Sequence, residues 1–211
     1  MKTRRLLTYL GMFLLVSQVA AGRTPPYGNF FEHFTIGVEW GYTQGFYQSR
    51  NYNYISEEGY RIFEENRRFQ AIANAQVLAH FGYRFRDKMN IAVYGGYMGM
   101  GKDNRLLPVM LRVSFFPFTD VEDGMFAYAQ GGVAWHIHST AGNMAALAAL
   151  GGGYRFRLSF YTNLDLLLGV KYLRDHPSIP NPEGPGNVPE HNIRMNKAGY
   201  CALDVSIAIS F

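Results

Sequence analysis

The stretch that decides the fold runs from Phe69 to Arg86 and reads FQAIANAQVLAHFGYRFR. Apolar side chains occupy every odd position, whereas most even positions are polar or small. A period of two sends successive side chains to opposite faces, which is typical of a β-strand. The stretch is far longer than the ~5 to 6 residues of an ordinary soluble strand. It therefore predicts a long strand with one continuous apolar face.

The same alternation recurs along the rest of the chain. It defines eight segments: 33–47, 67–86, 89–100, 106–118, 124–138, 144–158, 161–174 and 193–211. The connections 48–66 and 175–192 are long and others are short, an asymmetry typical of barrels with both termini in the periplasm. These patterns predict an all-β protein, an eight-stranded antiparallel transmembrane β-barrel. Within the fourth segment, Pro108 cannot donate a ladder hydrogen bond, so we expect that strand to begin after Pro108 or to contain a bulge there.

The first residues have the pattern of a secretory signal peptide. Lys2, Arg4 and Arg5 precede an apolar stretch from Leu6 to Val16, which is too short to span a bilayer, and small residues end at Ala21. We expect a signal peptide over 1–21 with cleavage near Ala21, a short periplasmic segment over 22–32 and the barrel over 33–211. Much of the formal charge of +4 belongs to the leader, and no nucleic-acid motif is present. Cys201 is the single cysteine, which excludes an internal disulfide.

A short repeat fits the barrel. The sequence GYRFR occurs at 82–86 and again at 153–157. At the ends of two descending strands, its aromatic residues would form a girdle at the periplasmic interface: Tyr83, Phe85, Tyr154 and Phe156.

The leader, the alternating segments and the aromatic C-terminus resemble the small outer-membrane β-barrels of Gram-negative bacteria. The resemblance implies that the final strand is a signal read by the barrel-assembly machinery. The residues concerned are Leu203, Val205, Ile207, Ile209 and Phe211. It also implies an outer-membrane location, with outer-membrane lipid and lipopolysaccharide as surroundings and other envelope proteins as partners. Neither nucleic acid nor a cofactor is expected as a partner.

Strand parity sends a set of polar side chains into the barrel interior. An eight-stranded barrel has room only for side chains, so opposite charges there should pair and fill the lumen. Glu39 and Arg112 lie near the middle of their strands and are the pair we expect first. The expected network comprises Glu39, Arg84, Arg112, Arg155, Asp165, Lys171 and Asp204, with Arg194, Asn74, Gln76 and Gln130 also facing inward.

The stretch 135–143, WHIHSTAGN, raises two chemical alternatives. His136 and His138 share one face of a strand and could supply two ligands to a metal, which do not by themselves make a site. The stretch is also weakly similar to the signature of outer-membrane lipid A deacylases, with His138 and Ser139 as the catalytic candidates. The match departs from that signature because His138 directly precedes Ser139, and neighbouring strand residues point to opposite faces.

Aromatic residues in the first long connection suggest an interaction surface. They are Tyr52, Tyr54, Tyr60 and Phe63, among mixed charges. The sequence therefore favours a structural or protein-interaction role for a filled barrel that is not a general porin. The alternatives are a lipid A-modifying acyl hydrolase or acyltransferase and, third, a narrow channel for small solutes.

Overall fold

The computed structural model describes residues 33–211 except positions 57, 87, 102–104, 119–122, 138–143, 160–161 and 183. The expected signal peptide, its cleavage near Ala21 and the segment 22–32 lie outside the described residues, as do His138 and Ser139. No helix in the described part of the chain is long and apolar enough to cross a membrane.

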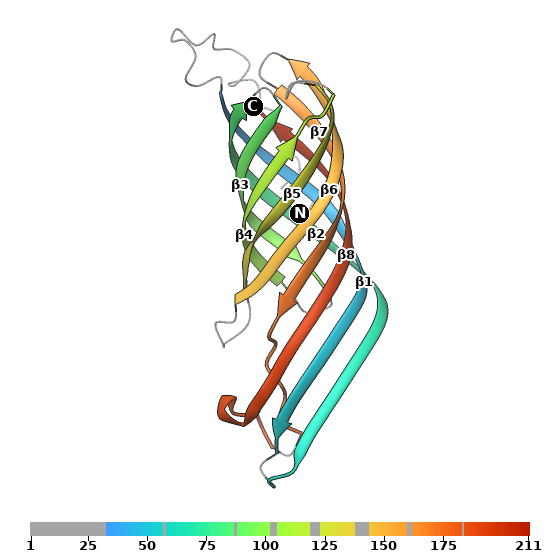
Figure 1. The fold of residues 1–211 in the computed structure, drawn as a ribbon, viewed down its shortest axis with the longest axis vertical. Coiled ribbons are helices and arrows are strands. Elements are labelled where there is room, and N and C mark those ends of the chain that lie inside the picture. The colour runs from blue at the N-terminus through green and yellow to red at the C-terminus, as the bar shows by residue number, and fades with distance from the viewer. Residues whose placement is uncertain are drawn as a thin grey trace, which may run out of the picture.

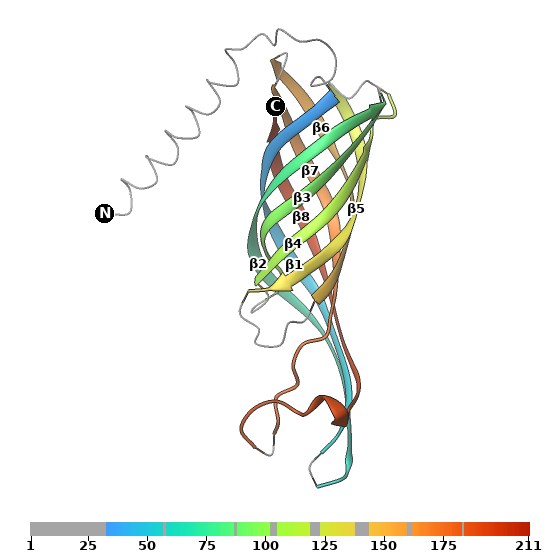
Figure 2. The ribbon, with the colours of Figure 1, turned by 90° about the vertical axis from the view of Figure 1, so that its left-hand side faces the viewer.

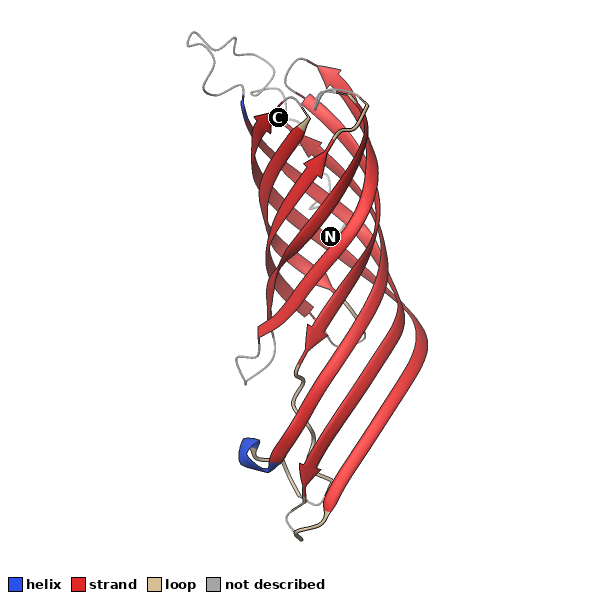
Figure 3. Ribbon diagram, in the orientation of Figure 1, coloured by secondary structure: helices blue, strands red, loops and turns tan. Residues whose placement is uncertain are grey.

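Eight antiparallel strands form one closed ring, in which each strand pairs with its neighbours in sequence and β1 also pairs with β8 (Figures 1 and 3). This confirms the predicted fold class. The strands are β1 Phe34–Ile55, β2 Arg61–Arg86, β3 Met89–Gly99, β4 Arg105–Phe115, β5 Gly124–His136, β6 Met144–Ser159, β7 Thr162–Asp175 and β8 Ile193–Ser210. A single turn of 3-10 helix, Glu190–Asn192, precedes β8.

The outer surface of the barrel is apolar, as the alternation predicts. Odd residues of β2 and even residues of β7 face outward, and Phe81 and Leu168 are 55% and 62% exposed. The four aromatic residues of the GYRFR repeats also face outward. Within the closed barrel, even residues of β2 and odd residues of β7 face inward, and Leu78 and Leu167 are buried there. A side-chain period of two thus separates an apolar exterior from a packed lumen.

Three strands continue beyond the rest of the barrel. β1 and β2 remain paired as far as Ile55↔Arg61, whereas β2 pairs with β3 only from Gln76↔Met98 onward. β8 leaves β7 beyond Asp175↔Ala198 but stays paired with β1. We call residues 47–55, 61–75 and 193–197 the β1–β2–β8 extension; it projects from the end of the barrel opposite the C-terminus (Figures 1 and 2). A register shift between Gly45 and Tyr47 marks its start on β1.

The extension corrects one prediction. Residues 48–66 are not a long loop, because β1 runs to Ile55 and β2 begins at Arg61. Both faces of this hairpin are largely polar, so this part of the sequence lacks the apolar alternation that indicates the other strands. Arg194, expected in the lumen, is exposed on the extension because β8 has already left the closed ring there.

Pro108 also differs from its prediction. β4 begins at Arg105, before Pro108, and its register with β5 runs without a shift through Pro108↔Ala134. The ladder is interrupted on the other side of β4. There the pairing with β3 has a gap between Gly95↔Val109 and Met98↔Leu106. Gly96 occupies this gap with a φ of 156°, a conformation that L side chains rarely adopt. The missing N–H of Pro108 is thus accommodated by an interrupted ladder and an adjacent glycine.

Candidate functional site

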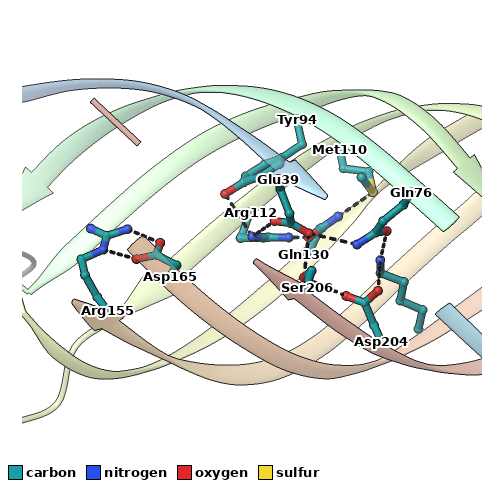
Figure 4. Close-up of polar contacts among 11 residues, drawn as sticks. Glu39, Gln76, Tyr94, Met110, Arg112, Gln130, Arg155, Asp165, Asp204 and Ser206 are labelled. Atoms are coloured by element: carbon teal, nitrogen blue, oxygen red, sulfur yellow. Dashed lines mark hydrogen bonds and ion pairs between the residues drawn. The ribbon is translucent and has the colours of Figure 1, made fainter. Parts of the chain in front are cut away.

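Polar side chains collect in the middle of the barrel lumen (Figure 4). Glu39, on β1, is fully buried there. Its Oε2 accepts a hydrogen bond from Arg112 Nη1 at 2.7 Å, and its Oε1 accepts from Gln76 Nε2 and Ser206 Oγ, each at 3.1 Å. The structure therefore brings together Glu39 and Arg112, the pair singled out from the sequence.

The Arg112 guanidinium is held on several sides. Its Nε donates to Gln130 Oε1 at 2.8 Å and its Nη1 donates to the Tyr94 hydroxyl at 3.0 Å. The same group lies over two aromatic rings, with Arg112 Cζ 4.0 Å from the Tyr94 centroid and 4.6 Å from that of Tyr128. Cation–π contacts strengthen when they are removed from water, so these rings help to compensate the buried charge.

A second ion pair is joined to the first by Gln76. Lys171 Nζ lies 2.9 Å from Asp204 Oδ1 and also donates to the side-chain oxygen of Gln76. Thr43 Oγ1 donates to the same Asp204 oxygen at 3.2 Å. Because Gln76 donates to Glu39 and accepts from Lys171, the two pairs form one connected group. We call it the lumen network: Glu39, Thr43, Gln76, Tyr94, Arg112, Gln130, Lys171, Asp204 and Ser206.

The lumen network is electrically balanced, since two cations face two carboxylates when all four are ionised. Seven of the eight strands contribute to it; the exception is β6. Isolated charges in such a buried place would cost several kcal/mol each, and only close pairing with further hydrogen bonds offsets this cost. Chemically, the arrangement holds the strands in register and fills the lumen with ordered side chains.

A separate pair lies on β6 and β7. Arg155 makes a bidentate contact with Asp165, with Nε and Nη2 donating at 2.7 and 2.6 Å. Its guanidinium also lies 5.1 Å from the ring centroid of Phe116. Arg84, the remaining member of the expected network, is half-buried on β2.

Apolar residues occupy the lumen between the lumen network and the extension. Met98, Leu106 and Leu173 are fully buried there and Met100 nearly so, while Met110 reaches the lumen network, where Gln130 Nε2 donates to its sulfur at 2.6 Å. They come from β3, β4, β7 and the turn after β3, so they close the interior from several sides. Sequence parity predicted the charged members of the lumen network, but it did not single out Thr43, Tyr94 or Ser206. These three also occupy inward positions, so the signal was present in the alternation.

At the end of β5, His136 Nε2 lies 3.1 Å from Asp175 Oδ1. Asp175 is fully buried and its Oδ1 also accepts from the backbone N–H of His176. His136 therefore faces a lumen carboxylate, a partner that sequence reasoning did not identify. Among the described residues, no group of three or more His, Cys, Asp or Glu side chains is placed to hold a metal ion.

The four aromatic residues predicted to form an outer interaction surface have different surroundings. Tyr54 is 4% exposed and packs with Ile179 and Val188 of the last connection. Tyr52 donates to Glu64, and burial, followed by this hydrogen bond, raises the pKa of Tyr52 to about 12. Tyr60 and Phe63 are 50% and 58% exposed, so these two are accessible on the extension.

The C-terminal residues complete the ring beside β1. Leu203, Val205 and Ile207 are exposed on the outer face, whereas Ile209 and Phe211 are half-buried. The Phe211 N–H donates to the Ile36 carbonyl at 2.8 Å and its carbonyl accepts from the Ile36 N–H at 3.0 Å. The last residue thus joins the first strand through main-chain bonds.

A closed ring of eight strands with an apolar outer surface and a packed, charge-balanced lumen defines the class of small transmembrane β-barrels. Comparison of the sequence with protein-family models and with curated protein sequences gives no match. Solved structures similar to this chain include the outer membrane protein OprG from Pseudomonas aeruginosa, with 14% identity and a TM-score of 0.49 over 85% of this chain and 96% of that one.

Two further structures are similar over comparable lengths. Neisserial surface protein A (NspA) is 12% identical, with a TM-score of 0.39 over 82% of this chain and 95% of that one. The attachment invasion locus protein Ail of Yersinia pestis, solved with the heparin analogue sucrose octasulfate, is 12% identical, with a TM-score of 0.35 over 85% and 99%.

Proposed function

We propose that this protein is an integral outer-membrane barrel with a structural or protein-interaction role, and that it is not a general porin. The filled lumen supports this role: a connected group of buried ion pairs lies beside a layer of buried methionine and leucine. A solute would have to break charge-assisted hydrogen bonds to pass. In this proposal the lipid of the outer membrane contacts the apolar belt, and the extension faces the cell exterior, where lipopolysaccharide and other envelope proteins are within reach.

Conductance tests the proposal. The refolded full-length mature chain, inserted in a planar lipid bilayer, is expected to show no large, stable openings. The double variant Glu39→Ala/Arg112→Ala removes the central ion pair and leaves space in the lumen. Its conductance should therefore be higher than that of the wild-type protein. The matched control is Arg67→Ala, an exposed position on the extension. Large, stable openings in the wild-type protein would refute the filled-lumen role and favour the channel.

The acyl hydrolase or acyltransferase alternative depends on His138 and Ser139, which lie outside the described residues. Lipid A mass spectra from cells with and without the gene test it directly, because a lipid A-modifying enzyme must change the acyl pattern. The proposed structural or interaction role predicts identical spectra.

The role of the C-terminal strand in assembly and the periplasmic position of both termini belong to the same proposal. They are supported by the outward apolar positions of β8 and by the position of the C-terminus at the end opposite the extension (Figure 1).

A further inference from the structure

One edge of the extension has no strand beside it in the described part of the chain. β2 pairs with β1 from Arg61 to Tyr83, but on the other side its pairing with β3 begins only at Gln76. The side-chain amide of Asn74, two residues before Gln76, faces the main-chain N–H and C=O of Gly101, which follows β3, at 3.2 and 3.1 Å. Residues 61–73 therefore present unpaired main-chain groups, which form a template for another strand. They include no proline that would prevent pairing.

The sequence of this edge is complementary to itself when reversed. Residues 63–69 read FEENRRF, with two acidic residues before Asn66 and two basic residues after it. In an antiparallel pair of two copies centred on Asn66, Glu64 faces Arg68 of the second copy and Glu65 faces Arg67. Phe63 faces Phe69 at both ends. Opposite charges and aromatic pairs directly across an antiparallel ladder are the favourable cross-strand combinations.

The side chains concerned are available for such contacts. Phe63 and Phe69 are 58% and 86% exposed, and Arg67 is also well exposed. Within one copy, Arg67 pairs with Glu65 at 2.5 Å and Arg68 donates to Asn66 at 3.0 Å. These are neighbours two residues apart on one face of the strand, and exposed pairs of this kind are weak. They can exchange for partners across the ladder at little cost.

The direction of the extension decides where the second copy lies. Figures 1 and 2 show the extension continuing away from the barrel along its long axis. An antiparallel partner strand therefore carries its own barrel in the opposite direction. Asn66 lies ten residues beyond Gln76, which is ~33 Å of extended strand. The two barrels are then well separated along this axis, as they would be in two facing membranes.

We propose that the free edge of β2 binds the same edge of a second copy of this chain, in an antiparallel pair centred on Asn66 that joins two membranes. This inference rests on the proposed function, because it names the partner of the extension. Each of the two charge contacts occurs twice about the two-fold axis. Association should therefore weaken with added salt, as exposed ion pairs do.

The experiment uses the full-length mature chain, refolded into phosphatidylcholine vesicles and followed by turbidity and by energy transfer between two labelled vesicle populations. Wild-type vesicles are expected to aggregate. Glu64→Arg/Glu65→Arg makes the edge wholly basic and Arg67→Glu/Arg68→Glu makes it wholly acidic. Each double variant alone should lose aggregation by about tenfold or more, because like charges then oppose each other. Mixing the two variants should restore aggregation, since basic edges then meet acidic ones.

Matched controls locate the contact. Lys197→Glu changes an exposed charge on β8, on the far side of β1 from the free edge of β2, and should aggregate as the wild type does. In a Cys201→Ser background, Asn66→Cys should form cross-links between the two vesicle populations. Glu58→Cys at the hairpin tip should not, because the two copies of that residue lie far apart in the proposed register.

Several results would overturn the inference: dispersed wild-type vesicles, aggregation of either charge variant alone at the wild-type level, failure of the mixture, or cross-links confined to one vesicle population. Failure of the proposed function can be distinguished from failure of the self-association. It would give large conductance, or gel electrophoresis of the same preparations would lack the band of the folded barrel that shifts on heating. A folded, closed and dispersed barrel would refute only the self-association.

Discussion

Glu39 and Arg112 illustrate how a charged residue can be placed inside a barrel. The Glu39 carboxylate accepts three hydrogen bonds and the Arg112 guanidinium donates to three acceptors, all from side chains. Removing one partner leaves an uncompensated buried charge, whereas removing both leaves only neutral groups. The consequences of these two changes should therefore differ.

We expect Arg112→Met to lower the stability of the folded barrel by about 3–5 kcal/mol, because the Glu39 carboxylate stays buried without its cation. Glu39→Gln/Arg112→Met should recover much of this loss. The stability of both variants is measured by urea titration in detergent, with the heat-dependent shift in gel mobility as the readout of the folded fraction. Arg67→Met, at an exposed pair with Glu65, should change stability by roughly 0–1 kcal/mol. Equal losses in the single and double variants would contradict the argument.

Tyr52 offers a pH test outside the barrel. Because burial and the bond to Glu64 raise its pKa from 10.0 to about 12, the folded hairpin keeps the phenol protonated where the unfolded chain does not. The resulting stability is fully present below pH 10 and is lost as the pH rises toward 12. The difference in absorbance at 295 nm between wild type and Tyr52→Phe gives the transition. Glu64→Gln should move it toward 10, and a transition already at 10 in the wild type would contradict the contact.

The sequence predicts strands where one face meets lipid, and it fails to predict them where neither face does. Val77 and Phe81 alternate with Leu78 and His80, so the barrel part of β2 is recognisable from period alone. Positions 48–55 are mainly polar on both faces, and their pairing with β2 follows from the long hairpin register, which no local pattern encodes. The same limit applies to the His136–Asp175 contact, because it joins β5 to the end of β7.

The last connection is held to the extension mainly by one apolar cluster. Tyr54 packs with Ile179 and Val188, beside a cavity of about 420 Å³ between the connection and β8. We expect Tyr54→Ala to cost about 3 kcal/mol locally and to release residues 177–188. Hydrogen exchange and limited proteolysis should show faster exchange and cleavage in this connection alone. Phe63→Ala, on the exposed side of the same hairpin, is the control and should leave both unchanged. Unaltered protection in Tyr54→Ala would contradict the anchoring role.

The contacts that close the ring are main-chain hydrogen bonds, whereas assembly in cells is proposed to depend on a side chain. Phe211 adds the last two bonds between β8 and β1 through its backbone N–H and C=O to Ile36, so replacing its aromatic ring leaves both bonds intact. We expect Phe211→Ala to refold into detergent or vesicles with nearly wild-type yield and urea midpoint. If the assembly machinery reads the terminal aromatic ring, the same variant should reach the outer membrane of cells in much lower amounts.

Deletion of Phe211 provides the complementary measurement, since it removes both main-chain bonds as well as the ring. It should lower refolding yield in vitro and also reduce assembly in cells. Quantitative immunoblots of outer-membrane fractions, compared with gel-shift yields of the purified chains, separate the two effects. Wild-type amounts of Phe211→Ala in the outer membrane would exclude the ring as the assembly signal. Equal defects of Phe211→Ala in vitro and in cells would instead assign its role to the stability of the closed barrel.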